Sequence, residues 1–574
     1  MKLRTAVVIA AIGVAGFVIT PVASAKGTAF VPGFTNTVAA HSIGPAGGLS
    51  PIGTAGTGNT PRSVVVSPNA QFAFVSNFGG ASISPYTIGA SGALTPNGAA
   101  VLAGTNPEGM AITPNGNFLY VANQGSNDIS GYTISATGTP VPIGNVAAAQ
   151  VKEVAISGTG LFLYASTDAG VRSYAIDQGT GALNPIGGVV AAGTGPKGVA
   201  TTPNGQFAYV ANTTSNDVFA YSIGADGSLT SLGPAAAGTT PQTVAVDQGG
   251  LFVFVANFTD PGNVTALTIG ADGTLTPVGT FPTGSSFAYG ADAAPNGKLY
   301  VTNFVSAVNP GTVSVFDVAA GGSLTPISGS PFPAGVNGPE FQSIAITPNQ
   351  GPRAMFTATP QGAGNAALFS ANSSSDPDGG SVVRYDWDFG DGSTLPNGGP
   401  TPTHVYANAG NYDVTLTVTD DEGCSTTVIF TGQTADCNGS SAARMTQTVP
   451  ISASDTAPNL KLSAKKKQKL KKTVTVKAKT ADDTDAVAKG KLRIQGPKEG
   501  KVALATSFSL KKDKAELDAG EKEKLKPRLS NKAYKKAKKA LKKGGKVTAK
   551  VKVKVTDAND DTDKLTVKVK LTKP

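Results

Sequence analysis

A repeat of about 45 residues constrains this 574-residue chain more than any other feature. One copy starts at Pro196 and reads PKGVATTPNGQFAYVANTTSNDVFAYSIGADGSLTSLG. Successive copies start 44 to 47 residues apart, and the other five begin at Pro61, Pro107, Val151, Pro241 and Ala288. Each has a strand of small residues, a turn such as PNG in which glycine takes a positive φ, an aromatic-aliphatic strand and two further strands. The chain is therefore predicted to build a series of small, similar β-sheets.

Four short strands in each repeat are typical of one blade of a β-propeller. Incomplete fragments flank the six complete copies: residues 29–53 supply only later strands, and residues 341–349 supply only a first strand and its turn. Paired in one sheet, the two fragments make a seventh blade that closes the ring and removes its free edges. We therefore predict a seven-bladed propeller over residues 29–350.

The strands FAYVAN, FLYVAN and LYVTN, each preceded by a PNG turn, resemble the YVTN repeats of bacterial surface-layer propellers. They are equally similar to the lactonase-type seven-bladed propellers related to 6-phosphogluconolactonase. The second resemblance implies hydrolysis of a sugar lactone as one possible activity, but one fold hosts many functions. The only histidine of the repeat region, His41, aligns with large side chains of other blades such as Tyr86 and Tyr221, so we expect it to pack rather than to act as a base.

The mouth of the central channel is the better candidate for a ligand site. The second residue of each innermost strand forms a ring, with Glu153 beside it: Arg62, Glu108, Lys152, Lys197, Gln242, Tyr289 and Gln342. Such a ring could bind a small anionic or sugar ligand, or it could be an ordinary solvated rim. Because no histidine or metal-ligand cluster joins it, we favour binding or scaffolding over catalysis and expect no confident catalytic residue.

Residues 351–454 change character and resemble a PKD domain, a small immunoglobulin-like sandwich of secreted bacterial proteins. The motifs that carry the resemblance are YDWDFGDG from Tyr385, HVY from His404 and DVTLTVTD from Asp413. Period-two alternation in the last strand places its apolar side chains on one face, over the core ring of Trp387. His404 belongs to the strand signature and is expected to be structural.

Calcium and a disulfide are two further expectations for this module. Some PKD domains bind calcium, and four acids could cluster at one end of the sandwich, although turn chemistry explains them more simply: Asp376, Asp378, Asp420 and Asp421. No other cofactor is expected. Cys424 and Cys437, the two cysteines of the chain, are expected to form a disulfide that clips a hairpin-like insertion.

Residues 460–574 are predicted to form a basic β-sandwich with one short helix. From Ile451 onward the chain has 36 Lys and Arg against 14 Asp and Glu, whereas residues 1–450 have 11 against 23. Runs such as Val547–Val555 alternate apolar residues with Lys or Thr, the pattern of a half-buried strand with one cationic face. Ser530 and Gly544 are the expected ends of the helix. The pattern resembles C-terminal immunoglobulin-like modules of other secreted bacterial proteins.

Residues 1–25 read as a secretory signal peptide: Lys2 and Arg4 precede an apolar run and the small residues Ala23-Ser24-Ala25. We therefore expect an extracellular or cell-surface monomer with no membrane span after cleavage. Its basic module would bind a cell-envelope polyanion, or the protein would bind an extracellular glycan or protein, because lysine suits diffuse polyanions and nucleic-acid readout would need arginine and aromatic residues. The leading hypothesis is a modular all-β binding or adhesion protein, and the alternative is a secreted lactonase-like hydrolase.

Overall fold

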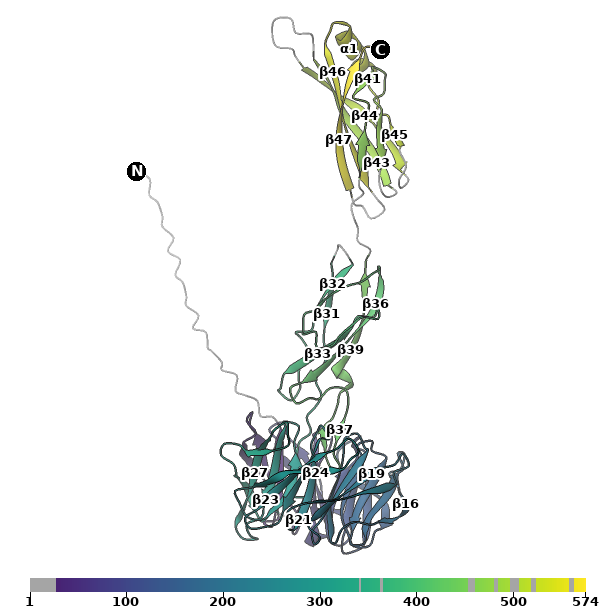
Figure 1. The fold of residues 1–574 in the computed structure, drawn as a ribbon. Helices are drawn as coiled ribbons and strands as arrows, with labels where there is room; N and C mark the ends of the chain where they lie inside the picture. The colour runs from purple at the N-terminus through teal and green to yellow at the C-terminus, as the bar shows by residue number, and fades with distance from the viewer. Residues whose placement is uncertain are drawn as a thin grey trace, which may run out of the picture.

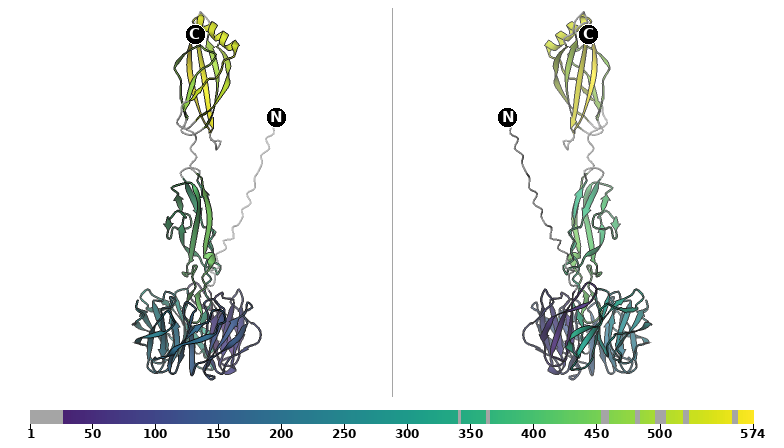
Figure 2. Two further views of the ribbon diagram at one scale, coloured as in Figure 1. Left: turned by 90° about the vertical axis from the view of Figure 1, so that its right-hand side faces the viewer. Right: turned by 90° about the vertical axis from the view of Figure 1, so that its left-hand side faces the viewer.

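The computed structural model describes residues 27–339, 342–361, 365–452, 460–479, 484–495, 505–517, 523–556 and 562–574. The predicted signal peptide lies outside the described residues. Three β-rich bodies follow one another along the chain: a disc, a slender sandwich standing on the disc, and a second sandwich (Figures 1 and 2). Within these ranges, no helix is long and apolar enough to span a bilayer. The predicted all-β class is confirmed, with a single α-helix among the described residues.

The disc is a propeller of seven sheets. Blade 1 contains β1 (Thr28–Gly33), β2 (Thr37–Ile43), β3 (Leu49–Gly56) and β30 (Ala345–Ile346). Blade 2 contains β4 (Pro61–Val66), β5 (Phe72–Asn77), β6 (Ser82–Ile88), β7 (Leu94–Pro96) and β8 (Val101–Leu102), with the short 3-10 helix η1 (Phe78–Gly80). Blade 3 contains β9 (Pro107–Ile112), β10 (Phe118–Asn123), β11 (Asp128–Ile134) and β12 (Pro140–Ala147).

The other four blades repeat this order from the axis outward. Blade 4 contains β13 (Val151–Ile156), β14 (Phe162–Thr167), β15 (Gly170–Ile176) and β16 (Leu183–Val190). Blade 5 contains β17 (Pro196–Thr201), β18 (Phe207–Asn212), β19 (Asp217–Ile223) and β20 (Leu229–Ala236). Blade 6 contains β21 (Pro241–Val246), β22 (Phe252–Asn257), β23 (Asn263–Ile269) and β24 (Leu275–Pro282). Blade 7 contains β25 (Ala288–Ala293), β26 (Lys298–Asn303), β27 (Pro310–Val318), β28 (Leu324–Pro326) and β29 (Phe332–Asn337).

The ring closes through a blade built from both ends of the repeat region. Strand β30 pairs antiparallel with β1, with Ala29 opposite Ile346 and Phe30 opposite Ala345. Phe341, the predicted start of this fragment, lies outside the described residues. His41 is buried in β2, and its Nε2 lies 2.9 Å from the carbonyl oxygen of Ala334 in the neighbouring blade. His41 therefore packs between blades, as its alignment with aromatic residues indicated.

Small residues allow the innermost strands to approach one another at the axis. A Cβ added to Gly109 would lie 2.8 Å from Cα of Glu153. One added to Gly198 would lie 2.6 Å from the carbonyl oxygen of Gln242, and one on Gly290 would lie 2.8 Å from the backbone nitrogen of Ser343. Contacts this close leave no room for a side chain, so glycine at these positions sets the width of the channel.

The second body has a sheet of β31 (Thr357–Pro360), β32 (Ala366–Ser370) and β35 (Thr403–Val405). It packs on a sheet of β33 (Val382–Asp388), β34 (Thr394–Leu395), β36 (Gly410–Asp420) and β39 (Arg444–Ile451). Trp387 is 2% exposed, and the apolar face of β36 packs into the same core. Between β36 and β39, the chain forms the hairpin of β37 (Ile429–Phe430) and β38 (Ala435–Cys437), followed by η2 (Ser441–Ala443). The predicted disulfide between Cys424 and Cys437 closes this insertion.

The third body contains a sheet in the order β41 (Lys467–Lys469), β47 (Thr562–Thr572), β46 (Lys546–Thr556), β43 (Thr484–Gln495) and β44 (Ala505–Leu517). A smaller sheet contains β40 (Lys461–Ser463), β42 (Val476–Lys479) and β45 (Glu523–Leu525). Helix α1 (Asn531–Lys542) begins after Ser530, whose side chain accepts a hydrogen bond from the N–H of Ala533. Gly544, at a φ of 81°, follows its end. The apolar residues of β46 are fully buried between the layers, so the strand alternates as its sequence predicts.

Candidate functional site at the channel mouth

The innermost strands run in the same direction through the disc, so the channel has two chemically different mouths. Lys197 stands at the start of β17, whereas Thr201 stands at its end. Four residues of extended chain separate them by roughly 13 Å. The ring of polar side chains predicted from the sequence lies at the mouth where these strands begin, which we call the Lys197 mouth.

Lys197 is the centre of one half of this ring. Its Nζ donates hydrogen bonds to Oε1 of Gln242 at 2.7 Å and to Oη of Tyr289 at 3.1 Å. The ammonium group also lies 4.9 Å from the centre of the Tyr289 ring. The three side chains come from blades 5, 6 and 7, so the fold unites residues that are 45 and 92 positions apart. They hold a positive charge at a defined place beside the channel.

Arg62 and Glu108 form the other half of the ring. Nη1 of Arg62 donates to Oε1 of Glu108 at 3.1 Å, and its guanidinium carbon lies 3.6 Å from the centre of the Phe78 ring. The ring face and the carboxylate together fix the direction of the guanidinium. Lys152 is turned toward Asp168, with 3.5 Å between Nζ and Oδ1, and thus belongs to an ion pair at the rim.

Glu153 is the most deeply placed acid of this mouth, at 1% exposure. Its Oε2 accepts a hydrogen bond of 2.9 Å from the backbone N–H of Val199. Its Oε1 is buried without a hydrogen-bond partner among the described residues. Burial raises the pKa of this carboxyl well above its usual range, and the nearby Glu108 adds to the rise. A raised pKa favours the protonated form of this carboxyl, and a carboxyl that carries a proton can act as a general acid.

Gln342 has a different role from the rest of the predicted ring. It is buried, and its Oε1 accepts hydrogen bonds from Oγ of Ser63 and from the N–H of Met110. Its Nε2 donates to the carbonyl oxygen of Met110 at 3.1 Å. The amide therefore ties together the innermost strands of three blades and contributes to closure of the ring.

A group of aromatic residues at the same mouth was missed from the sequence. Phe258 stacks on Phe287 with ring centres 4.7 Å apart and meets Tyr289 edge-on at 5.1 Å. Phe304 lies 6.1 Å from Phe258. The available signal is an Asn-Phe pair that ends the second strand of blades 2, 6 and 7, as in Asn303-Phe304. These rings give the Lys197 mouth an apolar wall next to its charged ring.

The hairpin of the second body occupies the opposite mouth. Backbone N–H groups at the ends of three innermost strands donate to carbonyl oxygens of residues 431–433. Phe430 and Ala435 are buried in one cluster with propeller side chains such as Val154. Figure 1 places β37 at the face of the disc on which the second body stands. The Lys197 mouth is therefore the end of the channel that the hairpin leaves uncovered.

Acidic side chains gather where the second body meets the disc. Carboxylate oxygens of Asp376, Asp420 and Glu422 lie within 4.8 Å of one another. The Oδ2 atoms of Asp376 and Asp420 are buried without a hydrogen-bond partner among the described residues. Burial raises the pKa of both carboxyls to about 7. Unsatisfied buried carboxylate oxygens are the kind of donor that a calcium ion requires, so these residues fit such an ion.

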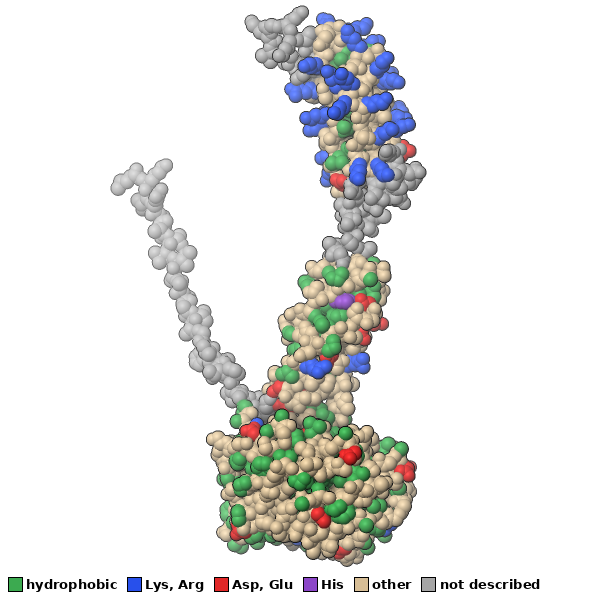
Figure 3. All heavy atoms as spheres, viewed as in Figure 1, with side chains coloured by type: hydrophobic (Ala, Val, Ile, Leu, Met, Phe, Trp, Pro, Cys, Tyr) green, Lys and Arg blue, Asp and Glu red, His purple; other side chains and the backbone are tan. Residues whose placement is uncertain are grey.

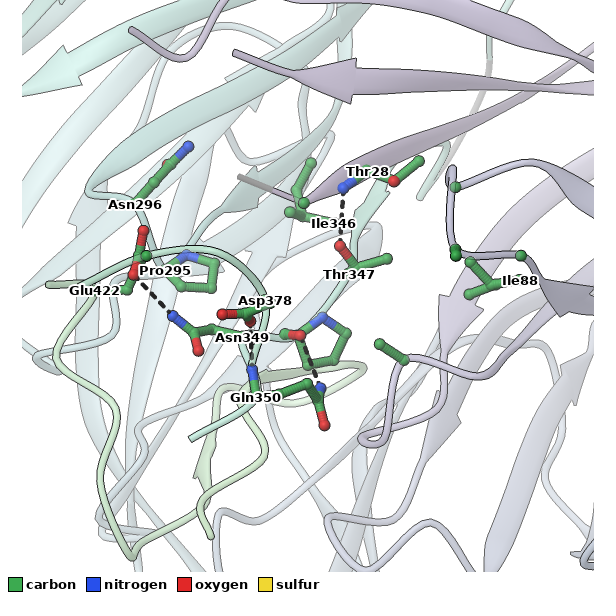
Figure 4. A pocket seen from close by; sticks show the side chains of 17 residues that line it. Thr28, Ile88, Pro295, Asn296, Ile346, Thr347, Asn349, Gln350, Asp378 and Glu422 are labelled. Carbon is green, nitrogen blue, oxygen red and sulfur yellow. Dashed lines mark hydrogen bonds between the residues drawn. The ribbon is translucent and has the colours of Figure 1, made fainter. Parts of the chain in front are cut away.

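The two other acids predicted for calcium are engaged in backbone contacts. Asp378 accepts a hydrogen bond of 2.8 Å from the N–H of Gln350, and Asp421 accepts one of 2.8 Å from the N–H of Ser381. Glu422, which was not among the predicted acids, takes part in the cluster, and its carboxylate also accepts a hydrogen bond from the side-chain amide of Asn349 at 3.2 Å. Figure 4 shows the contacts of Asp378 with Gln350 and of Glu422 with Asn349, which lie at a cavity of about 170 Å³ between the disc and the second body.

Comparisons with known proteins agree with the modular organisation. Residues 45–152, 138–226 and 221–342 match the family model described as lactonase, 7-bladed beta-propeller. Residues 349–434 match the PKD domain model. A candidate 6-phosphogluconolactonase from Bacteroides uniformis superposes with a TM-score of 0.50 at 17% identity, over 56% of this chain and 99% of that one. At this identity the superposition supports the fold alone.

Curated relatives match this chain over short stretches, and two of them illustrate the extent. A microbial collagenase of Vibrio alginolyticus is 42% identical over 87 residues, which are 15% of this chain and 10% of the relative. The pre-pro-metalloprotease PrtV of Vibrio cholerae is 47% identical over 85 residues, 15% of this chain and 9% of the relative. The chain thus spans about a tenth of the length of these relatives, and their activities do not transfer with the match. The propeller match covers more than half of the chain, which belongs to the lactonase, 7-bladed beta-propeller family and carries a PKD domain after its propeller.

Proposed function

We propose that this protein is an exported binding protein. Its basic C-terminal module retains it at the cell envelope, and the propeller offers the Lys197 mouth to a small ligand. The signal-like N-terminus supports export. The single observation that carries the proposal is the lysine face of the C-terminal module.

Lysines stand opposite one another across the large sheet of this module. Lys489 of β43 faces Lys552 of β46, and Lys554 of β46 faces Lys564 of β47. Like charges directly opposite on one face of a sheet are destabilising unless a counter-charge lies between them. None of these lysines forms a salt bridge with a described residue. The sheet therefore tolerates a repulsion that a bound polyanion would relieve.

The lysine face is hollowed as well as charged. A cavity of about 440 Å³ is lined by Val487, Lys489, Lys512, Lys514, Lys552, Lys554 and Lys564. Lys and Arg side chains gather over this module in Figure 3, whereas the disc shows few of them on the same side of the molecule. Ammonium groups act as point charges that suit repeated anionic groups, and few aromatic residues are present to stack on bases. A linear envelope polyanion is the partner that fits this surface.

Binding to a purified wall polyanion at several salt concentrations tests the proposal. The variant K489Q/K552Q/K554Q/K564Q should bind more weakly, and its log-log salt slope should fall by roughly one unit for each lost phosphate contact. A control of equal charge, K532Q/K535Q/K538Q/K542Q, alters four exposed lysines of α1, away from this face, and should lose less affinity. Equal loss in both variants would reject a specific face, and salt-independent binding would reject an electrostatic tether.

Lactone hydrolysis is the second candidate function. It is favoured by membership of the lactonase propeller family and by the buried Glu153 carboxyl near Lys197 in the uncovered mouth. Ring opening needs a group that moves a proton and a donor that stabilises the developing oxyanion, and Glu153 and Lys197 can supply these. Assays of the full chain on sugar lactones, with Glu153→Ala and Lys197→Ala, separate the two functions. Turnover abolished by both substitutions would establish the hydrolase.

Calcium is proposed as a structural ion of the PKD domain. Asp376, Asp420 and Glu422 would hold it, and the ion would supply the positive charge that their crowded carboxylates need. Its position at the base of the insertion makes its expected role mechanical: it would stiffen the junction between the PKD domain and the propeller.

A further inference from the structure

At the ends of the innermost strands of four neighbouring blades, backbone N–H groups donate hydrogen bonds to the hairpin insertion of the PKD domain. N–H groups of Thr201, Ile156 and Ile112 donate to the carbonyl oxygens of Thr431, Gly432 and Gln433, at 3.0, 2.7 and 3.0 Å. In blade 2, the N–H of Val66 donates to Oγ1 of Thr434 at 3.3 Å. Four consecutive hairpin residues thus each accept a hydrogen bond from one backbone N–H, and the four N–H groups belong to four consecutive blades. This one-to-one order is the geometry of a fitted ligand rather than of a loop resting on a surface.

Side chains of the hairpin fit the same mouth. Gly432 has a φ of 137°, and a Cβ there would lie 3.2 Å from Cβ of Ala155 and 3.4 Å from Cα of Ala200. The amide of Gln433 donates to the carbonyl oxygen of Val199 at 2.5 Å. Phe430 is fully buried in a cluster that includes Ile156 of the propeller. The tip of the hairpin is therefore held in the mouth by hydrogen bonds, by the close contact of Gly432 and by the buried ring of Phe430.

The base of the hairpin is anchored in a second layer of contacts. The N–H of Asn349 donates to the carbonyl oxygen of Asp436, and the N–H of Asn438 donates to that of Asn349, both at 2.9 Å. Nε2 of Gln248, in blade 6, donates to the carbonyl oxygen of Glu422 at 3.1 Å. The disulfide from Cys424 to Cys437 joins the two ends of the insertion and so limits its freedom when undocked.

We propose that this mouth of the propeller is a binding site for a disulfide-closed hairpin, and that the PKD domain supplies this ligand in cis. The docked hairpin plugs the channel and makes the propeller and the PKD domain one rigid unit. Exogenous ligands of the channel then enter through the Lys197 mouth alone. A site that recognises backbone carbonyls in order will also accept the same hairpin as a separate peptide once its own copy is removed.

Binding in trans tests this inference on the full chain. One variant replaces residues 430–435 by Asn-Gly, and a second carries Gly432→Val, which introduces a branched side chain between Ala155 and Ala200. The probe is a synthetic peptide of residues 424–437 cyclised through its two cysteines, titrated by calorimetry. We expect one peptide to bind each molecule of the replacement variant and at least tenfold weaker binding to the unaltered protein. No binding to a replacement variant with a native circular dichroism spectrum would overturn the proposal.

Hydrogen exchange gives a test that does not need the replacement variant to fold. In the unaltered protein, the amides of Ile112, Ile156 and Thr201 should exchange slowly, because their acceptors belong to the hairpin. Gly432→Val should speed their exchange at least tenfold, whereas Val199 N–H, which donates to Glu153 inside the propeller, should be unaffected. The matched control Thr427→Val changes an exposed hairpin residue and should leave all four amides as they are. Fast exchange of the three amides in the unaltered protein would rule out a docked plug.

Discussion

Asp292 couples the closure of the propeller to pH. It lies in β25, and its Oδ2 accepts a hydrogen bond of 2.8 Å from the N–H of Ile346 in the closing strand. Burial raises the pKa of this carboxyl to about 6, from 3.8. The folded state thus favours the protonated form of Asp292. The contribution of this carboxyl to the free energy of unfolding is complete below pH 3.8 and is lost as the pH rises through 6.

Asp292→Asn keeps an oxygen acceptor for Ile346 but cannot ionise. Between pH 4 and 7, the free energy of unfolding of the unaltered protein should fall relative to this variant by about 2 kcal/mol. Urea titrations at each pH measure the difference. Asp247 and Asp436 also have a raised pKa, and the charge of Asp292 adds to the rise at Asp436, so the difference between the two proteins reports Asp292 together with its coupling to Asp436. Parallel stability curves for the two proteins would contradict the prediction.

Asp420 is the residue on which the predicted stabilisation of the protein by calcium depends. Its Oδ1 accepts backbone hydrogen bonds from Glu422 and Cys424, whereas its Oδ2 is buried without a partner among the described atoms. Calcium at a hundred times its dissociation constant should stabilise the folded chain by about 2.7 kcal/mol, and Asp420→Asn should remove most of this gain. Scanning calorimetry with and without calcium measures it. Asp388→Asn, which alters an exposed acid of the same domain, should retain the full gain; an equal loss in both variants would argue against this site.

Single residues show where sequence reasoning reached its limit. The ring position of Lys197 followed from the repeat, because each blade places its second residue at the same mouth. The burial of Glu153 and the use of Gln342 for bonding between blades did not follow, because each depends on contacts between residues far apart in sequence, such as Gln342 with Met110. Glu422 was overlooked beside Asp420 and Asp421 because a run of three acids gives no indication of which side chain turns inward.

The hairpin is the element that departs most from sequence-based expectation. Its disulfide and its place after β36 were predicted, but its insertion into the mouth of the propeller channel was not. The tip Thr431-Gly-Gln-Thr434 carries no hydrophobic period, and its partners lie in strands some 230 to 370 residues away. By contrast, the blades followed directly from their period and turns, because all of them except the split blade 1 are built from neighbours in sequence. Local pattern therefore predicted the modules, whereas the contact between them required the structure.

Removing the disulfide should weaken the docked insertion. In the loop-closure model, a cross-link between residues 13 positions apart, such as Cys424 and Cys437, contributes about 3 kcal/mol. The variant C424S/C437S should lose stability of this order in denaturant titrations. Unaltered protein under reducing conditions should show the same loss, while the double serine variant should not respond to reductant. Equal stability of the oxidised protein and the variant would mean that the insertion is held by its contacts alone.

At the scale of the whole molecule, charge and architecture divide at the same place. The acidic part, residues 1–450, contains the propeller and nearly all of the PKD domain, and the basic part contains the C-terminal module. The hairpin joins the propeller and the PKD domain through backbone hydrogen bonds and a shared apolar cluster. Opposite charges on separate bodies would let the basic end adhere to an anionic surface while the acidic end is held away from it, as the proposed tether requires.

This division predicts two unfolding transitions with different responses to salt. The propeller and the PKD domain should unfold together because the hairpin couples them, and the C-terminal module should unfold separately. Facing lysines such as Lys489 and Lys552 repel one another, so raising the ionic strength from about 0.02 to 0.5 M shortens the screening length severalfold and should raise the midpoint of the basic module by several degrees. The other transition should move less, since its buried hydrogen bonds are poorly screened. Calorimetry of the full chain and of a chain ending at residue 452 assigns the transitions; a single transition, or equal salt shifts in both, would contradict this division.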